Sequence, residues 1–278
     1  MTAPIAIVAS DGHRTLLKWH RARRKGSDPA FTGRRILEGM QAGASVEVDL
    51  VGHSDGGFAV LHDLTLDRMT TGTGPVRDAT AAELRGLHLR ANNGTPLPEK
   101  VMLLEDLAVL LAGRGLHPEA LLQLDFKEDA ASLTPRSVET FAQALSGIAS
   151  HFVLSSGDAE AVSLLTAATP GLRIGYDPCH MGAIARLKDS RDYAGFTADA
   201  LAAVPGAEWI YLDHELVLFA ADDGADLIAP FQAAGRRVDC YTIRRADAAG
   251  VDRARRLLAL RADQITTDDP DGLLAALS

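Results

Sequence analysis

The chain has 278 residues, 47% of them hydrophobic, which is enough to bury a large core. Its 28 basic and 37 acidic residues give a formal net charge of −9, and this balance argues against sequence-independent nucleic-acid binding, which needs phosphate neutralisation by Lys and Arg. The chain has no long apolar run, no basic region at its start and no paired cysteines, so we expect no stable membrane insertion and a cytoplasmic location.

Short apolar runs alternate with longer helical patterns along most of the chain. Residues 45–50 alternate strictly between apolar and polar, which predicts a strand with Glu47 and Asp49 on one face. The other predicted strands are 15–20, 120–127, 151–155, 172–176, 209–213, 237–243 and 263–266. The predicted helices are 34–44, 103–113, 135–147, 158–168, 196–204, 216–234 and 247–260, with a short final helix.

The strand-like run 58–63 is interpreted as an extension beyond the second strand, which leaves eight strands, each followed by a helix or a loop. Such alternation favours a parallel sheet. Eight strands in a chain of this length favour closure into a (β/α)8 TIM barrel over an open doubly wound sheet.

Residues 64–102 interrupt this rhythm. They are rich in Thr, Gly, Asn and Pro and hold one short helical piece at 80–87. Long loops on a barrel scaffold tend to lie over the active site. We therefore expect a single domain, 1–278, with an insertion at approximately 64–102 after the second strand.

Ionisable side chains gather at the ends of the first three predicted strands and of the extension. In a barrel these ends point to the same face, where active sites lie. This convergence carries more weight than any single residue. The side chains concerned are His20, Arg21, Glu47, Asp49, His62, Asp63, Asp125 and Lys127.

Glu47 and Asp49 point the same way from their strand. Two inward carboxylates repel each other unless a cation lies between them. A hard divalent ion such as Mg2+ or Ca2+ suits an all-oxygen site, to which Asp125 can add a third carboxylate. The alternative is a solvent-facing pair on an edge strand.

Beside such a cluster, His20 and His62 become candidates for general base and general acid, although a lone histidine is more often structural. Arg21 and Lys127 are cations suited to a phosphate group. An anionic substrate held by metal, Arg and Lys, with two histidines for proton transfer, describes phosphodiester hydrolysis.

At these residues the sequence resembles the glycerophosphodiester phosphodiesterase family. The resemblance runs from about residue 16 to the C-terminus and is densest in 17–87. The motifs that carry it occur in order as His20-Arg21-Ala22, Glu47-Val48-Asp49, His62-Asp63 with the following Leu66-Asp67-Arg68-Met69-Thr70, Asp125-Phe126-Lys127, Tyr241-Thr242 and Thr267-Asp268-Asp269-Pro270.

The resemblance implies hydrolysis of glycerophosphodiesters to glycerol 3-phosphate and an alcohol on a TIM barrel. It implies His20 and His62 as the acid–base pair and a divalent metal held by three carboxylates, with Arg21, Lys127 and Tyr241 binding the substrate. The metal ligands that it implies are Glu47, Asp49 and Asp125.

Several positions depart from the family pattern. Ala22 replaces a Gly, Ala30 stands where the family has a carboxylate, and Asp125 is one methylene shorter than the family's Glu. Tyr241 replaces a Trp, and Arg244 stands where Asn is common, which could favour a more anionic substrate. Two alternatives therefore stay open: a lysophospholipase D-type phosphodiesterase, and a non-catalytic barrel that binds a phosphorylated ligand. The sequence leaves the oligomeric state open.

Overall fold

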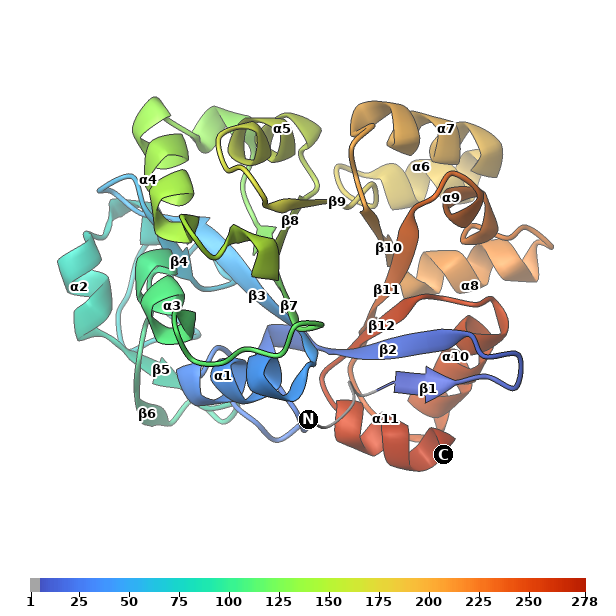
Figure 1. Ribbon diagram of the computed structural model, residues 1–278, viewed down its shortest axis with the longest axis horizontal. Helices are drawn as coiled ribbons and strands as arrows, with labels where there is room; N and C mark the ends of the chain where they lie inside the picture. Colours follow the sequence, from blue (N-terminus) through green and yellow to red (C-terminus); the bar gives the residue numbers. More distant parts are fainter. Residues whose placement is uncertain (1–5) are drawn as a thin grey trace.

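Eight parallel strands close into a barrel in the computed structural model, which describes residues 6–278. Hydrogen bonds join each strand to its neighbour, and the pairing of Trp19 with Val46 closes the ring. The (β/α)8 TIM-barrel prediction is confirmed (Figure 1). In ring order the strands are β2 (Arg14–Trp19), β3 (Ser45–Gly52), β7 (Leu121–Phe126), β8 (Phe152–Ser156), β9 (Arg173–Tyr176), β10 (Trp209–Asp213), β11 (Arg237–Ile243) and β12 (Gln264–Thr267).

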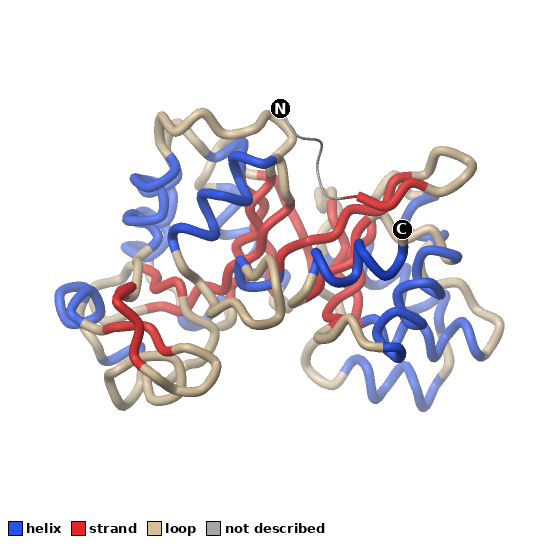
Figure 2. The backbone as a smooth tube through the Cα atoms, turned by 90° about the horizontal axis from the view of Figure 1, so that it is seen from below, coloured by secondary structure: helices blue, strands red, loops and turns tan. Residues whose placement is uncertain are grey.

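Helices surround the strands, as the view in Figure 2 shows. They are α1 (Gly33–Ala42), α3 (Leu104–Leu111), α4 (Pro135–Leu145), α5 (Ala159–Ala167), α6 (Ala183–Ser190), α7 (Tyr193–Ala203), α8 (His214–Asp222), α9 (Ala229–Ala233), α10 (Ala248–Ala259) and α11 (Pro270–Leu277). The single helix predicted at 216–234 is wrong, because the chain turns at Gly224 with φ of 82° and a new helix starts around Pro230. Helix α6 was not predicted.

Two antiparallel strands flank the barrel. The short β1 (Ala6–Val8) pairs with β2, and β4 (Phe58–Val60) folds back on the end of β3, pairing Leu50 with Val60. The run 58–63 therefore forms the return arm of a hairpin, not an extension in the barrel direction. This hairpin brings His62 back toward the carboxyl ends of the barrel strands.

The segment between β4 and α3 forms η2 (Val76–Asp78), α2 (Ala81–Gly86) and the β5 (His88–Arg90) and β6 (Pro96–Lys100) pair, which is a sheet separate from the barrel. These elements lie together at one side of the molecule in Figure 1. The Thr80 hydroxyl accepts a hydrogen bond from the Glu83 N–H, and the Glu83 carboxylate accepts one from the Thr80 N–H. This capping box starts α2 where the helical piece 80–87 was predicted. Three other short 3-10 turns are η1 (His20–Ala22), η3 (Ala130–Ser132) and η4 (Ala149–His151).

The interior of the barrel is apolar at one end and polar above it. Leu121, Val153, Trp209 and Tyr211 form a buried apolar cluster near the amino ends of their strands. Two positions further along β7, the inward side of the sheet carries Gln123 and then Asp125. Because side chains two positions apart lie on the same face of a strand, Leu121, Gln123 and Asp125 all point into the barrel. The charged group of the three lies at the carboxyl end of β7. Within residues 6–278 no helix is both long and apolar enough to cross a membrane.

Candidate active site

A cavity of about 180 Å³ opens at the carboxyl ends of the strands. Seven of the eight residues with a predicted role line it, and the eighth, Asp49, lies fully buried beside it. The lining contains charged, polar and aromatic side chains and no aliphatic one. Its residues are Lys18, His20, Arg21, Glu47, His62, Gln123, Asp125, Lys127, Asp177, His180, Tyr211, Tyr241, Thr242, Arg244 and Thr266.

His20 begins the turn that follows β2, and its ring is held by a carboxylate. Its Nδ1 lies 2.7 Å from Oδ1 of Asp268, which also accepts a bond of 2.8 Å from Arg23. Burial lowers the pKa of His20, and the Asp268 carboxylate partly opposes that effect. Burial acts to raise the pKa of Asp268, but the bonds from His20 and Arg23 outweigh it and hold that pKa at about 2. The histidine is therefore oriented through Nδ1, which leaves Nε2 for chemistry.

The turn after His20 places a backbone donor on the acidic cluster. Arg21 and Ala22 both have left-handed backbone angles, with φ of 54° and 58°. In this conformation the Arg21 N–H donates to Oε2 of Glu47 over 2.7 Å. The Gly-to-Ala departure at Ala22 therefore falls at a position whose backbone favours Gly.

His62 is held in the same way as His20. Its Nδ1 lies 2.8 Å from Oδ1 of Asp63, and Arg68 binds the same carboxylate. The Arg68 bond, more than that of His62, lowers the pKa of Asp63 to about 2. Burial lowers the pKa of His62, whose side chain is 35% exposed. Two histidines, each with a carboxylate on Nδ1, thus reach the same cavity.

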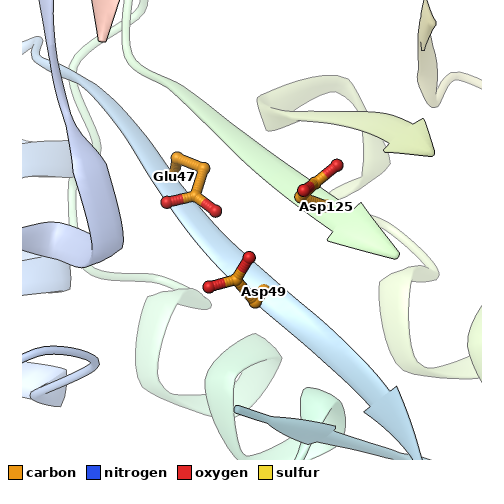
Figure 3. A group of neighbouring side chains, drawn as sticks. All are labelled: Glu47, Asp49 and Asp125. Carbon is orange, nitrogen blue, oxygen red and sulfur yellow. The ribbon is translucent and has the colours of Figure 1, made fainter. Parts of the chain in front are cut away.

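Three carboxylates from neighbouring strands converge between these histidines. Glu47 and Asp49 come from β3 and Asp125 from β7, and one oxygen of each lies within 4.8 Å of the others (Figure 3). Burial, and then the charge of Asp49, raises the pKa of Glu47. Such crowding of buried carboxylates is stable only with cations close by.

The nearest cations are two of the predicted phosphate ligands. Lys127 Nζ lies 2.8 Å from Oδ1 of Asp49 and also contacts Asp125, and Arg21 Nε lies 3.2 Å from Oδ2 of Asp49. Burial acts to lower the pKa of Lys127, but the charges of Asp125, Asp49 and Glu47 raise it overall. Neither oxygen of Asp49 has a well-aligned hydrogen bond, although the side chain is fully buried. A buried all-oxygen set of this kind fits a hard divalent cation.

A buried polar network lies beneath the carboxylates. Lys18 is 1% exposed, forms an ion pair of 2.9 Å with Asp239, and donates to Gln123. Gln123 donates to Ser155 over 2.8 Å, and the Ser155 hydroxyl donates to Oδ1 of Asp125 over 2.6 Å. This chain of hydrogen bonds fixes the direction of the Ser155 hydroxyl and thereby orients Asp125.

Another histidine lines the far side of the cavity. His180 Nε2 lies 2.9 Å from Oδ2 of Asp177, whose Oδ1 accepts the Cys179 N–H over 2.8 Å. The bond to Asp177 raises the pKa of His180. Tyr241 is half-buried nearby, and burial raises the pKa of its phenol.

The family model of the glycerophosphoryl diester phosphodiesterases matches residues 35–272. The chain belongs to this family. Its members are phosphodiesterases, so the assignment to the phosphoric diester hydrolases is confirmed. No curated protein matches the sequence significantly.

Solved structures of the same family have the same fold. A glycerophosphodiester phosphodiesterase from Agrobacterium tumefaciens is 22% identical, with 94% of this chain and 99% of that chain covered and a TM-score of 0.64. An Oleispira antarctica phosphodiesterase in complex with its product sn-glycerol-3-phosphate is 20% identical, with coverages of 94% and 96% and a TM-score of 0.64. A glycerophosphoryl diester phosphodiesterase from Parabacteroides distasonis is 19% identical, with coverages of 98% and 88% and a TM-score of 0.64.

Five residues of the site and its supports had no predicted role. Asp63 and Asp268 belong to the His-Asp and Thr-Asp-x-Pro motifs, but their roles as hydrogen-bond partners of the histidines follow only from the structure. Asp177 and His180 had a usable signal, because they lie one and four residues after the predicted strand 172–176. Lys18 had one too, because it lies two residues before His20 on the inward side of β2.

A larger cavity of about 740 Å³ lies elsewhere, between the β3–β4 hairpin and the start of α4. Its charged lining residues include Asp55, Arg77, Asp129 and Arg136, and it contains neither proposed catalytic histidine and none of the three clustered carboxylates. Size alone therefore does not identify the site, and the 180 Å³ cavity is the one in which acid–base and metal-binding groups converge.

Proposed function

We propose that this enzyme hydrolyses glycerophosphodiesters to glycerol 3-phosphate and an alcohol, with His20 and His62 as the acid–base pair. The observation that carries the proposal is the placement of two carboxylate-oriented histidines around one cluster of three carboxylates. Acid–base catalysis at a phosphodiester needs one group that accepts a proton and one that donates a proton. The product complex of the Oleispira antarctica enzyme supports the choice of substrate.

The two histidines divide the proton transfers. One accepts a proton at Nε2 from the attacking hydroxyl, which the family resemblance assigns to the glycerol of the substrate. The other donates a proton from Nε2 to the oxygen of the leaving alcohol. Water then opens the cyclic phosphate formed in the first step, with the two histidines exchanging roles. Asp268 and Asp63 hold the rings in place during both steps.

Glu47, Asp49 and Asp125 are the proposed ligands of a divalent cation, Mg2+ or Ca2+. When bound there, it would polarise the phosphoryl oxygens and stabilise the charge that develops on them. Arg21 and Lys127 lie against the same carboxylates and present their positive charges to the phosphate. Tyr241 is proposed to contact the rest of the substrate.

The test is the release of glycerol 3-phosphate from glycerophosphocholine and glycerophosphoethanolamine, with EDTA and after addition of Mg2+, Ca2+ or Mn2+. We expect turnover that EDTA abolishes and a divalent ion restores. His20→Ala and His62→Ala should each lower kcat by roughly 10²- to 10⁴-fold without loss of fold. His151→Ala serves as the matched control, because His151 lies outside the cavity.

The cavity lining bears on the lysophospholipid alternative. A lysophospholipid needs an apolar groove for its acyl chain, whereas the 180 Å³ cavity has no aliphatic side chain in its lining. We therefore favour a small polar phosphodiester. Turnover of lysophospholipids in preference to glycerophosphodiesters would reverse this choice, and an absence of turnover with every diester and metal would favour the non-catalytic binder. We further propose that the chain forms one domain and acts in the cytoplasm, in the breakdown of deacylated phospholipids.

A further inference from the structure

We propose that the cavity binds a second anionic group, a carboxylate or phosphate carried by the alcohol side of the substrate, through Arg244 and His180. This inference rests on the proposed function and adds a substrate class to it. The preferred substrates would then be glycerophosphodiesters whose head group carries a carboxylate or a phosphate. Head groups that carry a quaternary ammonium would be poor substrates.

The position of these two residues in the barrel supports the inference. Arg244 follows β11 and His180 follows β9, whereas the metal-binding and acid–base residues come from β2, β3, β7 and the turn after β4. Around the ring of eight strands, β9 lies opposite β2 and β11 lies opposite β7. A diester whose phosphate lies at the carboxylate cluster would therefore extend its alcohol toward Arg244 and His180.

Charge pairing distinguishes Arg244 from the other cations of the cavity. Lys18 pairs with Asp239 at 2.9 Å, while Arg21 and Lys127 pair with Asp49 at 3.2 and 2.8 Å. Among residues 6–278, no carboxylate lies within ion-pair distance of Arg244, and its guanidinium has no hydrogen bond. Its charge is therefore free for a ligand, and a guanidinium can bind a carboxylate or phosphate with two parallel hydrogen bonds.

His180 lines the same cavity as Arg244 and is held in place there. A Cβ atom at Gly157 would lie 2.3 Å from Cγ of His180, so the imidazole can sit there only because residue 157 is a glycine. Asp177 uses one oxygen for His180, at 2.9 Å, and the other for the Cys179 N–H, at 2.8 Å. The Asp177 carboxylate is thus occupied within the protein, and its bond keeps the pKa of His180 above the ordinary value.

The experiment compares kcat/KM for four diesters of glycerol 3-phosphate, with Mg2+ present. The alcohols are choline, glycerol, serine and glycerol 3-phosphate, so that the head group changes from cationic to neutral to carboxylate- or phosphate-bearing. We expect the wild-type enzyme to prefer the last two, and Arg244→Ala to lower kcat/KM for them by roughly tenfold. The variant should leave the choline ester unchanged or improve it. Arg245→Ala, which removes the adjacent arginine outside the cavity lining, is the matched control.

Binding separates this inference from the proposed function. Calorimetric titration of the same diesters into the His62→Ala variant measures head-group preference with turnover slowed by roughly 10²- to 10⁴-fold. If wild-type turnover is absent but the anionic diesters bind best and Arg244→Ala removes that preference, the proposed reaction fails and the anion site stands. Equal binding and equal kcat/KM across the four diesters, or an equal effect of Arg244→Ala on all of them, overturns the anion site.

Discussion

Breaking the ion pair inside the barrel should destabilise the protein far more than removing both of its charges. Lys18 and Asp239 are 1% and 0% exposed, and their charged atoms lie 2.9 Å apart. Lys18→Met leaves the Asp239 carboxylate buried with Thr266 as its remaining hydrogen-bond donor. The loss of one partner from a buried pair costs about 3–5 kcal/mol. The cation–π contact of Lys18 with Tyr211, at 4.4 Å, adds roughly 1 kcal/mol to that cost.

The double variant Lys18→Met with Asp239→Leu leaves no uncompensated charge. Its remaining cost is the loss of hydrogen bonds to Gln123 and Thr266, on the order of 2 kcal/mol in total, and of the cation–π contact with Tyr211, roughly 1 kcal/mol. Two single losses of about 4 kcal/mol would sum to roughly 8 kcal/mol if they were independent, so the cycle should show a coupling of several kcal/mol.

Urea unfolding of the wild type, both single variants and the double variant measures this coupling. The partly exposed pair Arg173 and Glu208, at 2.9 Å, is the matched control, with an expected coupling of about 0–1 kcal/mol. A single variant too unstable to fold agrees with the reasoning only if the double variant folds. Single losses that add to within about 0.5 kcal/mol of the double loss would refute it.

Three further predictions concern the site. The pKa of Asp268 is lowered from an ordinary 3.8 to about 2. Its ionised carboxylate therefore stabilises the folded protein above about pH 4, and this stabilisation is lost as the pH falls from about 4 to about 2. Wild-type unfolding free energy should therefore drop by about 2 kcal/mol more than that of Asp268→Asn across this window, and parallel curves would contradict it. Ala22→Gly should stabilise the protein by about 1 kcal/mol in thermal unfolding, because φ of 58° disfavours L residues, and a lower Tm would count against this. Ser155→Ala should weaken Mg2+ binding measured by calorimetry by about tenfold, because its hydroxyl orients Asp125, whereas Ser156→Ala should not.

The strands of the barrel were predictable because each one carries its own pattern. Residues 237–243 were predicted as a strand and form β11, and 120–127 covers β7 (Leu121–Phe126). The shared face of Glu47 and Asp49 followed from the same two-residue period, whereas their inward direction came from the closed barrel. Such local signals depend only on neighbours in the sequence.

Features that depend on the return of the chain were harder to predict. The apolar run at β4 has the composition of a strand, but its antiparallel direction is set by the turn at Gly56, where φ is 79°. The predicted helix 216–234 has an apolar pattern on both sides of its break. The interruption depends on the left-handed turn at Gly224 and on the N–H that Pro230 lacks, and neither changes the apolar pattern.

The site residues show the same division. Residues at strand ends could be selected one strand at a time, which identified several of those that line the cavity. Contacts across the barrel could not be predicted in this way, because they depend on which inward side chains of distant strands lie at the same level along the barrel axis. Lys18 and Asp239 are 221 positions apart in the sequence and meet only because β2 and β11 are brought together by β12.

The charges of the site can be balanced by a divalent metal ion, the phosphate of the substrate and an anionic head group bound at the same time. Four buried or half-buried carboxylates, those of Glu47, Asp49, Asp125 and Asp239, face the three paired cations Lys18, Arg21 and Lys127. With all of them ionised, one negative charge is in excess. A divalent cation turns this excess into a single positive charge, which a phosphodiester, itself singly negative, neutralises. The Asp177 carboxylate, which also lines the cavity, is matched by protonated His180, a form that their hydrogen bond favours. Arg244 then remains as an unmatched cation on the opposite wall, and a second negative charge on the substrate is what would balance it.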